Sequence, residues 1–489
     1  MFIKKITFPI SKPSLLLSLT VAGTLLYSCK KLVAIDPPAD SITTSEAFAN
    51  DNTATNAING IYSSMINTQS SINFASGGVT ILAGLSSDEF NYLGTDYLPF
   101  YNCSLLPDNI NMRVFLWDPI YSTIYKANAC IEGLTHSGTL SAGVKKQLLG
   151  EAEFLRAFSY FYLINLFGDA PLLTSTNWQS NAPLARTSAT DIYKQIVSDL
   201  TDAQNLLTSD YALFNNERIR ATKWAAAALL SRVYLYTKDY QKASDASSSV
   251  ISSALFNLPP PSQVFLRNNS EAIWQLQPSN KLSPFAVGEA YNLIPSALTR
   301  NYPPSVVSQY YQFFIPKYAL SQQLLNTFDS SDLRKSSWCD TTGSLNGTNY
   351  YYASKYKIYQ GTAGGDIPEY YTVLRLAEQY LIRAESYARQ SKLSQSVSDI
   401  NQLRVRAGLL PLSDTLNASQ VFAEIARERK IEFFCEWGHR WFDLKRRGEA
   451  DSTLGAVKGN NWKTTDQLYP IPITEIQKDP NLKQNAGYN

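Results

Sequence analysis

Two stretches of the chain carry the same spacing of small and aromatic residues, and this spacing limits the folds that the sequence can adopt. The intervals are three, six and three residues in both stretches: Ser231, Tyr234, Tyr240 and Ala243, then Ala384, Tyr387, Leu393 and Ser396. Each set falls on two helix-like segments joined by a short turn, which in the first stretch lies near Lys238-Asp239. Small residues allow paired helices to approach closely, and the larger residues fill the space between them.

This pattern resembles a tetratricopeptide helix pair, whose repeat is ~34 residues long. The two copies are not in tandem, so the sequence favours a divergent array of helix pairs with long insertions over a regular solenoid. An unrelated helical bundle with the same spacing is the alternative. The fold class predicted is mainly all-α, with tetratricopeptide-like helix pairs, long loop insertions and a few short strands.

Apolar periodicity places further helices along the chain. Helical spacing begins at Ser45 and returns from Trp117, and the run EAEFLRAFSYFYLINLF is apolar nearly all round, which predicts burial on several sides. Residues 68–113 are rich in Gly, Ser, Asn and Tyr without a sustained period, so we expect a loop-rich segment. EAIWQLQ alternates like a short strand around Trp274. Trp274 and Trp117 are expected in the core.

The start of the chain has the order of a bacterial secretory signal. Lys4 and Lys5 precede an apolar run over residues 14–27, and Ser28-Cys29 follows it. A cysteine after Leu-x-Ser is typical of a lipoprotein processing site, so we expect a signal peptide at 1–28, an acylated Cys29 and a tether over 29–44. A transmembrane anchor is the alternative, but a span needs ~20 apolar residues and this run is shorter.

Composition excludes several function classes for the remaining chain. The formal net charge is +2 and no dense Lys/Arg stripe is present, which disfavours nucleic-acid binding. The later cysteines are scattered without a CxxC pair, so we expect buried or neutral thiols and no zinc site: Cys103, Cys130, Cys339 and Cys435. We predict a helical region over 45–255 and a second region over 256–489 with a loop insertion at 256–369, together forming one compact globule.

Catalytic and cofactor motifs are absent from the sequence. The two histidines, His136 and His439, lie in no metal-binding or triad pattern, and no phosphate or dinucleotide glycine loop occurs. The charged segment IARERKIEFFCEWGHRWFDLKRRG (425–448) has carboxylates near a histidine, as acid–base catalysis needs. Helical ion pairs and arginine forks that join two helices explain it better. No metal, no cofactor and no catalytic residue is predicted.

Several segments in order resemble the SusD/RagB family of outer-membrane lipoproteins from Bacteroidetes-type bacteria. The segments cover nearly all of the mature chain: WDPIYSTIYKANACIEGL, EAEFLRAFSYFYLINLFGDAPLL, RTSATDIYKQIVSDL, AAAALLSRVYLYTKDYQKA, LRLAEQYLIRAESYA, INQLRVRAGL, IARERKIEFFCEWGHRWFDLKRRG and YPIPITEIQKDPNLKQNAGY.

The resemblance implies a lid-like protein that captures glycan, or in some members peptide. It implies that the ligand passes to a SusC-like TonB-dependent transporter without being cleaved. It also implies a lipid anchor in the cell outer membrane, with the body facing outward. Lys30 and Lys31 depart from the acidic residues that often follow the acylated cysteine in surface lipoproteins of these bacteria.

Two aromatic segments are the candidate ligand-binding sites, because sugar and peptide faces pack on flat rings beside polar groups. The first is DEFNYLGTDYLPFYN, and the second lies in the insertion. The candidate residues are Asp88, Tyr92, Tyr97, Tyr101, Asn102, Tyr291, Tyr302 and Tyr310. Each ring could instead pack its loop onto the helical body, and Asp88 could brace the loop. We expect replacement of Tyr97 or Tyr101 by Ala to weaken binding without lowering thermal stability.

The sequence therefore predicts a non-enzymatic glycan-binding lipoprotein partnered with an outer-membrane transporter. The alternatives left open are a peptide-binding member of the same family, a lipid-anchored glycoside hydrolase, and a purely structural surface protein or adhesin.

Overall fold

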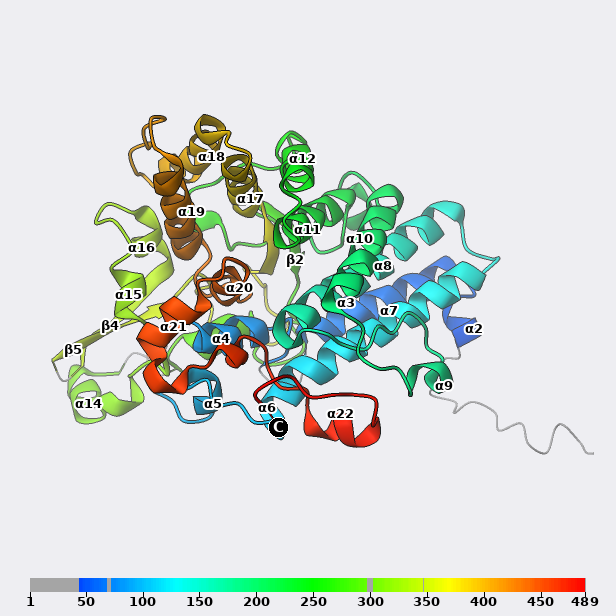
Figure 1. Cartoon of the computed structure of the whole chain (residues 1–489), viewed down its shortest axis with the longest axis horizontal. Helices are drawn as coiled ribbons and strands as arrows, with labels where there is room; N and C mark the ends of the chain where they lie inside the picture. The colour runs from blue at the N-terminus through cyan, green and yellow to red at the C-terminus, as the bar shows by residue number, and fades with distance from the viewer. Residues whose placement is uncertain (1–43, 68–71, 297–301, 346, 489) are drawn as a thin grey trace, which may run out of the picture.

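The computed structural model describes residues 44–67, 72–296, 302–345 and 347–488. The predicted signal peptide at 1–28, Cys29 and nearly all of the predicted tether at 29–44 lie outside the described residues. Within the described ranges, no helix is both long enough and apolar enough to cross a membrane. The prediction of a mainly helical protein with a few short strands is confirmed (Figure 1).

Long helices form the N-terminal half. α7 and α10 both pack on α8, and α3 packs on α7 and α8. The bounds in this half are α2 (Thr44–Ala47), α3 (Asp51–Ile66), α4 (Gly78–Ser86), β1 (Phe90–Tyr92), α5 (Leu98–Tyr101), α6 (Ile110–Met112), α7 (Asp118–His136), α8 (Ala142–Phe167), α9 (Trp178–Asn181), α10 (Ala189–Leu206), α11 (Lys223–Tyr236) and α12 (Tyr240–Ile251).

The C-terminal half begins with short elements and ends in helices. Its bounds are β2 (Ala272–Leu276), α13 (Gly288–Leu293), α14 (Pro304–Gln309), β3 (Tyr318–Leu320), α15 (Gln322–Leu325), α16 (Leu333–Trp338), β4 (Cys339–Leu345), β5 (Thr348–Ala353), β6 (Tyr371–Arg375), α17 (Leu376–Arg389), α18 (Leu393–Arg406), α19 (Ala418–Glu432), α20 (His439–Arg446), α21 (Ala450–Lys458) and α22 (Ile473–Lys478).

The two helix pairs with matching spacing stack directly on each other. α11 packs on α12, α12 packs on α17, and α17 packs on α18, although the whole 256–369 insertion separates the pairs in sequence (Figure 1). The small residues at the repeated positions are buried: Ser231, Ala243, Ala384 and Ser396. The array is therefore continuous in space and interrupted in sequence, as the divergent-array prediction requires.

Trp274 on β2 lies in the core, as predicted. Its ring is fully buried and meets Phe154 and Phe158 of α8 edge-on, with centroids 4.9 and 5.1 Å away. Phe158 in turn contacts the ring of Trp437, 5.5 Å away. One hydrophobic cluster thus includes residues from both sides of the boundary predicted at 255. The prediction that α8 is buried on several sides is confirmed, since 18 of its residues are buried.

The prediction of a loop-rich segment at 68–113 missed a helix. α4 has the sequence GVTILAGLS, and all nine of its residues are buried. A helix surrounded by protein on every side has no polar face, so its sequence lacks the 3.6-residue alternation that marks surface helices. Gly84 lies where an added Cβ would come within 2.7 Å of the Phe90 ring, which explains why glycine stands at this close contact.

Short strands form two small sheets. The larger has the order β1-β3-β5-β4, and the other pairs β2 with β6. β2 confirms the strand predicted around Trp274. In the larger sheet, β1 and β3 are antiparallel, with Phe90 opposite Leu320 and Tyr92 opposite Tyr318. This pairing joins the first candidate segment to the insertion that holds the second, eight residues after Tyr310.

Candidate functional site

The two candidate segments meet where β1 ends and β3 begins. The backbone N–H of Leu93 donates to the carbonyl of Lys317, 2.9 Å away. The ammonium of Lys317 donates to a carboxylate oxygen of Asp96, 2.6 Å away. Both charged groups are about half exposed, so this ion pair stands at the surface. Main-chain pairing and the ion pair fix the first segment against the insertion.

Tyr92 is a support for the first segment rather than an exposed ring. It is buried, and its ring packs on Tyr318 and Tyr101, with centroids 5.4 and 5.9 Å away. Its hydroxyl accepts a hydrogen bond from the backbone N–H of Tyr97 at 3.1 Å. Burial raises the pKa of this phenol to about 12. The ring has no face to offer a ligand.

Tyr97, Tyr101 and Asn102 are half-buried around the short helix α5. Tyr97 meets Phe115 edge-on, with the centroids 6.3 Å apart. The ammonium of Lys458 lies 4.1 Å from the centroid of the Tyr101 ring and covers that face. These two rings therefore tie the loop to α21 and to the residues before α7.

Asp88 lies inside the protein, away from any surface that a ligand could reach. Its carboxylate accepts from Arg440 at 2.6 Å and from Lys430 at 2.9 Å. Burial is the largest single influence on the pKa of this carboxyl and raises it, but the two cations together outweigh burial and hold the pKa well below its usual range. The bracing role that the sequence left open for Asp88 is the one that the structure supports.

The insertion presents the exposed rings. The exposed fractions are 38% for Tyr302, 43% for Tyr310 and 67% for Phe313. Tyr302 stands edge-on against the buried Phe314, with centroids 5.6 Å apart. Tyr310 and Phe313 flank each other at 6.5 Å. We call Tyr302, Tyr310 and Phe313 the ring cluster.

The ring cluster lies on and beside α14, at the lower left of Figure 1. The next residues of the chain lead into β3, and Phe313 precedes Lys317 of the Asp96–Lys317 ion pair by four residues. Two apolar side chains of the first segment are also exposed, Leu93 and Leu98. The prediction from sequence did not include Phe313, Leu93 or Leu98. The dense aromatic run YYQFF at 310–314 was a signal for Phe313, and the two leucines had none.

Tyr291 belongs to a different arrangement from the ring cluster. It is half-buried on α13 and stacks on Tyr359, with centroids 4.8 Å apart and rings 25° from parallel. α13 packs against the buried helix α4. The stack therefore joins α13 to the loop after β5.

The charged segment 425–448 is a structural joint. The guanidinium of Arg375 donates to three carboxylates, those of Glu271, Glu432 and Glu436. Arg334 on α16 donates to Glu432 as well, and all of these side chains are buried. Fork-like arginine contacts with carboxylates fix the orientation of the elements that they join. The network ties α16, β6 and α19 together, as the structural interpretation of this segment predicts.

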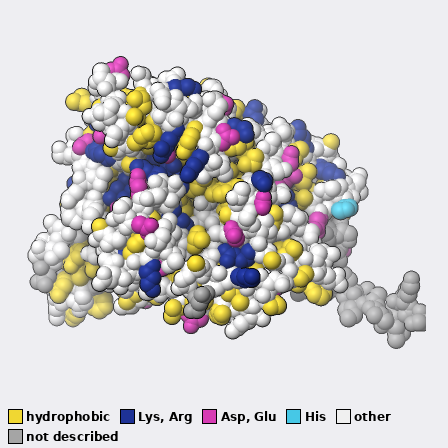
Figure 2. All heavy atoms as spheres, viewed as in Figure 1, with side chains coloured by type: hydrophobic (Ala, Val, Ile, Leu, Met, Phe, Trp, Pro, Cys, Tyr) yellow, Lys and Arg dark blue, Asp and Glu magenta, His cyan; other side chains and the backbone are white. Residues whose placement is uncertain are grey.

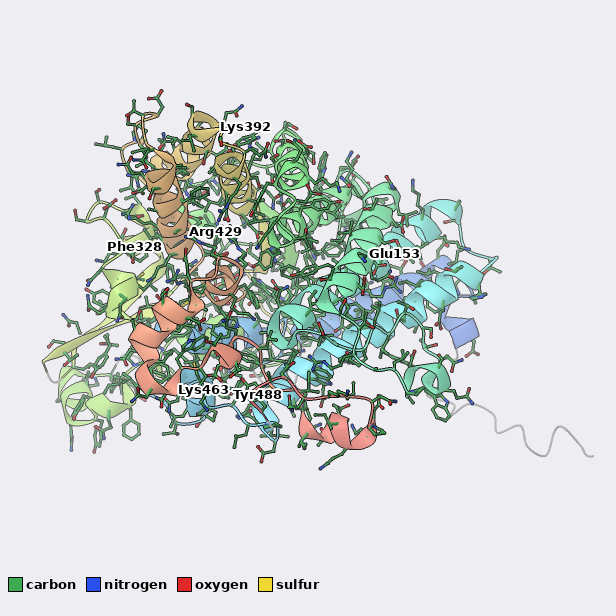
Figure 3. The ribbon with its side chains drawn as sticks, viewed as in Figure 1. Glu153, Phe328, Lys392, Arg429, Lys463 and Tyr488 are labelled. Carbon is green, nitrogen blue, oxygen red and sulfur yellow. The ribbon has the colours of Figure 1, made fainter. Side chains whose placement is uncertain are left out.

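The joint continues into α20. Arg429 donates to Asp443 at 2.6 Å, where α19 approaches α20 (Figure 3). His439 is buried beside these groups, and burial holds the pKa of its ring well below the ordinary value. A neutral histidine without access to solvent cannot exchange protons with a substrate, so this segment lacks the geometry of an acid–base site.

Neither the metal-binding side chains nor the thiols in the described part of the chain form a functional site there. No group of three or more His, Cys, Asp or Glu side chains is placed to hold a metal ion there. The four later cysteines are free thiols, and burial raises the pKa of each: Cys103, Cys130, Cys339 and Cys435. The prediction of buried or neutral thiols is confirmed.

Two family models match the chain in succession. The model described as "Starch-binding associating with outer membrane" matches residues 96–235, and the model described as "SusD family" matches residues 323–488. The ring cluster falls between the two matched ranges.

Individual proteins named as SusD-like also resemble this chain over most of its length. "SusD-like protein P2" of Formosa agariphila is 28% identical over 431 residues, which cover 79% of this chain and 83% of that protein. A SusD superfamily protein from Bacteroides vulgatus has the same fold, with a TM-score of 0.76, 22% identity, and coverage of 90% of this chain and 100% of that one.

A second solved structure contains a bound sugar. "Surface glycan-binding protein A from Bacteroides thetaiotaomicron in complex with laminarihexaose" aligns with a TM-score of 0.72 and 20% identity, over 89% of this chain and 99% of that one. Its likeness concerns the fold. The two matched ranges and the relative aligned over most of its length show that this chain belongs to the SusD/RagB family.

Proposed function

We propose that the protein binds glycan on the ring cluster and passes it to a SusC-like TonB-dependent transporter in the outer membrane. The observation that carries the proposal is the exposure of Tyr302, Tyr310 and Phe313 on the chain segment that leads to Lys317, the lysine of the ion pair with Asp96. Sugar C–H faces pack on flat aromatic surfaces, and hydroxyls bond to neighbouring charged groups. Membership of a family whose models carry the names "SusD" and "Starch-binding" supports the choice of glycan.

The position of the ring cluster supports a role in choosing the ligand. The segment lies outside both ranges that the family models match, 96–235 and 323–488. The matched ranges hold most of the helices of the array, whereas the intervening segment carries the exposed rings. We infer that the rings set which glycan this chain prefers, while the helices supply the common frame.

The protein is a binding protein and not an enzyme. Proteins of the SusD family bind glycans without cleaving them. The alternative of a lipid-anchored hydrolase drew on the carboxylates of segment 425–448. These carboxylates are engaged with arginines inside the joint, as Glu432 is with Arg375 and Arg406.

Association with the outer membrane follows from the description of the matched family. The proposal also includes a lipid anchor at Cys29 and an outward orientation of the protein body. Replacing Cys29 by Ala should release the protein from membranes on fractionation. A Cys29→Ala protein that stays in the membrane fraction would contradict the anchor.

Binding to the ring cluster can be measured by calorimetry with laminari- and malto-oligosaccharides. Tyr310→Ala and Phe313→Ala should each weaken binding about tenfold, equivalent to ~1.4 kcal/mol. The matched control is Trp178→Ala, since Trp178 is 73% exposed but lies on α9 at the other side of the molecule (Figure 1). Equal affinity in the ring variants and the control would remove the cluster from the site. Binding of peptides in place of glycans would favour the peptide alternative.

The transporter partnership has its own test. Gentle solubilisation of outer membranes should recover the protein with a large barrel protein. Recovery of the protein alone from crosslinked membranes would favour the adhesin alternative.

A further inference from the structure

A tyrosine-lined groove runs along the helix array, apart from the ring cluster. It consists of two adjoining pockets of about 680 and 550 Å³ that share Tyr193 and Tyr236 in their walls. α10, the end of α11 and the start of α12 form one part, and α20 with the end of α8 forms the other. Pockets of several hundred cubic ångströms are the usual size of small-ligand sites.

Three tyrosines give the groove flat walls and hydroxyl groups. Tyr193, Tyr234 and Tyr236 are each only partly buried. The hydroxyl of Tyr193 bonds with the side-chain amide of Asn165. The hydroxyl of Tyr236 has no hydrogen-bond partner within the described part of the chain, although burial raises its pKa strongly. A ligand group placed in the groove would complete the bonding of this hydroxyl.

The charges on the α10 and α12 side of the groove are matched. Lys242 pairs with Asp239 at 3.0 Å, and Lys194 pairs with Asp191 at 2.7 Å. Each of these lysines therefore has its counter-charge on its own helix or at that helix's start.

Two arginines on the other side of the groove are also engaged. Arg446 is held by two acids that lie behind the wall, Glu385 at 2.7 Å and Asp443 at 2.8 Å. The guanidinium of Arg186 donates to main-chain carbonyls and to the side chain of Asn485, which anchors the C-terminal tail.

Lys445 is the exception. Its ammonium donates to the carbonyl of Asn165 at 2.5 Å, near the end of α8. No carboxylate of the described residues lies within ion-pair distance of it. The ammonium carries three N–H donors, so donors remain for a ligand. Burial lowers its pKa to about 7, which an anion beside it would reverse.

On the face shown in Figure 2, Lys and Arg side chains gather in dark blue over α19 and α20, and α20 is the helix that carries Lys445. Among the described residues that line the pocket of Lys445, Asp169 is the one carboxylate, and one of its oxygens accepts from the backbone N–H of Ala189. The charge of Asp169 acts on Arg186, whereas burial alone affects the ammonium of Lys445, so Lys445 has no matching acid in the wall.

We propose that this groove is a second carbohydrate site, which takes an acidic oligosaccharide with a carboxylate on Lys445 and sugar rings against Tyr193, Tyr234 and Tyr236. The choice of a sugar depends on the proposed function, whereas the requirement for an anion depends on Lys445 alone. An acidic sugar combines the two groups that the groove lacks, a negative charge and a hydrogen-bonding hydroxyl for Tyr236.

Calorimetry with trigalacturonate and with neutral maltotriose tests the proposal on the full-length mature protein. The wild-type protein should bind trigalacturonate, and Lys445→Gln or Tyr236→Phe should weaken this binding at least about fivefold, because each removes one donor to the ligand. Tyr310→Ala, in the ring cluster, should leave this affinity unchanged. Maltotriose should show no dependence on Lys445.

Two results would overturn the second site: no binding of trigalacturonate, or binding that both groove variants retain in full. Loss of trigalacturonate binding in Tyr310→Ala alone would place the acidic sugar on the ring cluster and would also overturn it. Tyr236→Phe removes one hydroxyl only, so it decides the matter if Lys445→Gln fails to fold. If Tyr310→Ala leaves the affinity for neutral glycans unchanged, that result contradicts the proposed function and does not affect the groove proposal.

Discussion

Arg232 on α11 and Glu378 on α17 form a two-point ion pair inside the helix array. The two nitrogen–oxygen distances are 2.6 and 2.7 Å, and both side chains are buried. The pair joins helices that the 256–369 insertion separates in sequence. The third guanidinium nitrogen donates to the hydroxyl of Tyr162 on α8, at 3.0 Å. One guanidinium thus connects three helices of the array.

Removing one partner of this pair should destabilise the protein strongly. Glu378→Gln leaves a buried guanidinium without its counter-charge, which costs about 3–5 kcal/mol. Urea unfolding measures the change. The control is Asp191→Asn, which breaks the exposed pair with Lys194 and should change the free energy of unfolding far less, because solvent screens this pair. A loss of similarly small size for Glu378→Gln would show that the pair contributes little to holding the array together.

The stability of the protein should decline as pH rises through the neutral range. Burial raises the pKa of Glu289 to about 8 and that of Glu89 to about 7. The folded protein keeps these protons above the pH at which the unfolded chain, with a pKa near 4.5, releases them. The two protonated carboxyls therefore contribute fully to stability below pH 4.5, and this contribution is lost as the pH approaches 8.

Glu289→Gln isolates one of the two groups. Thr80, Glu436 and Lys355 also affect the pKa of this carboxyl. A glutamine side chain has the same shape as the glutamate that it replaces. The fall in unfolding free energy between about pH 5 and 8.5 should shrink by more than ~1.4 kcal/mol, the equivalent of one pKa unit. Asp202→Asn, at an exposed position on α10, serves as the control. An unchanged pH profile would refute the assignment of a buried neutral carboxyl.

Tyr101→Ala should lower stability, contrary to the expectation from sequence. The ring packs on Tyr92 and lies under the ammonium of Lys458. Truncating a half-buried aromatic residue should cost about 1–2 kcal/mol of apolar burial. Thermal unfolding compares this variant with Tyr310→Ala, whose exposed ring should matter by less than ~0.5 kcal/mol. A fully stable Tyr101→Ala protein with impaired ligand binding would support the expectation from sequence instead.

Gly84→Ala should be destabilising because the space beside Gly84 in α4 has no room for a methyl group. The added Cβ would come within 2.7 Å of the Phe90 ring and 3.2 Å of a Glu89 carboxylate oxygen. Overpacking of this kind costs about 1–3 kcal/mol, which urea unfolding would measure. Gly60→Ala is the matched control, since that glycine lies within α3 and an added Cβ would have nothing within 4 Å. Alanine there should stabilise the helix by about 0.5–1 kcal/mol.

The helical frame could be predicted from sequence because its helices alternate apolar and polar faces. α10 has this alternation, with Ile192, Ile196 and Leu200 buried on one face. α4 could not be found in the same way, since burial on all sides removes the alternation. The sheet β1-β3-β5-β4 was also missed, because Phe90 and Leu320 meet through backbone pairing between segments far apart in the chain.

The candidate site could be located only in outline. Aromatic content drew attention to two segments, and the structure pairs the first with β3, which follows the second in the chain. Spacing could not separate exposed rings from supporting rings, because Tyr92 and Tyr310 both stand in aromatic runs and differ in what the fold packs on them. The partner of Asp88 was equally beyond reach, since Arg440 lies 352 residues further along the chain.

The pairing of β1 with β3 has a consequence for how such proteins diversify. Main-chain hydrogen bonds depend little on which side chains the strands carry, so the frame tolerates sequence change in the segment before β3. Tyr302, Tyr310 and Phe313 can then be exchanged for other residues during evolution without loosening the helices behind them. A lineage that meets a new nutrient could adapt by drifting in this short stretch while inheriting the rest unaltered.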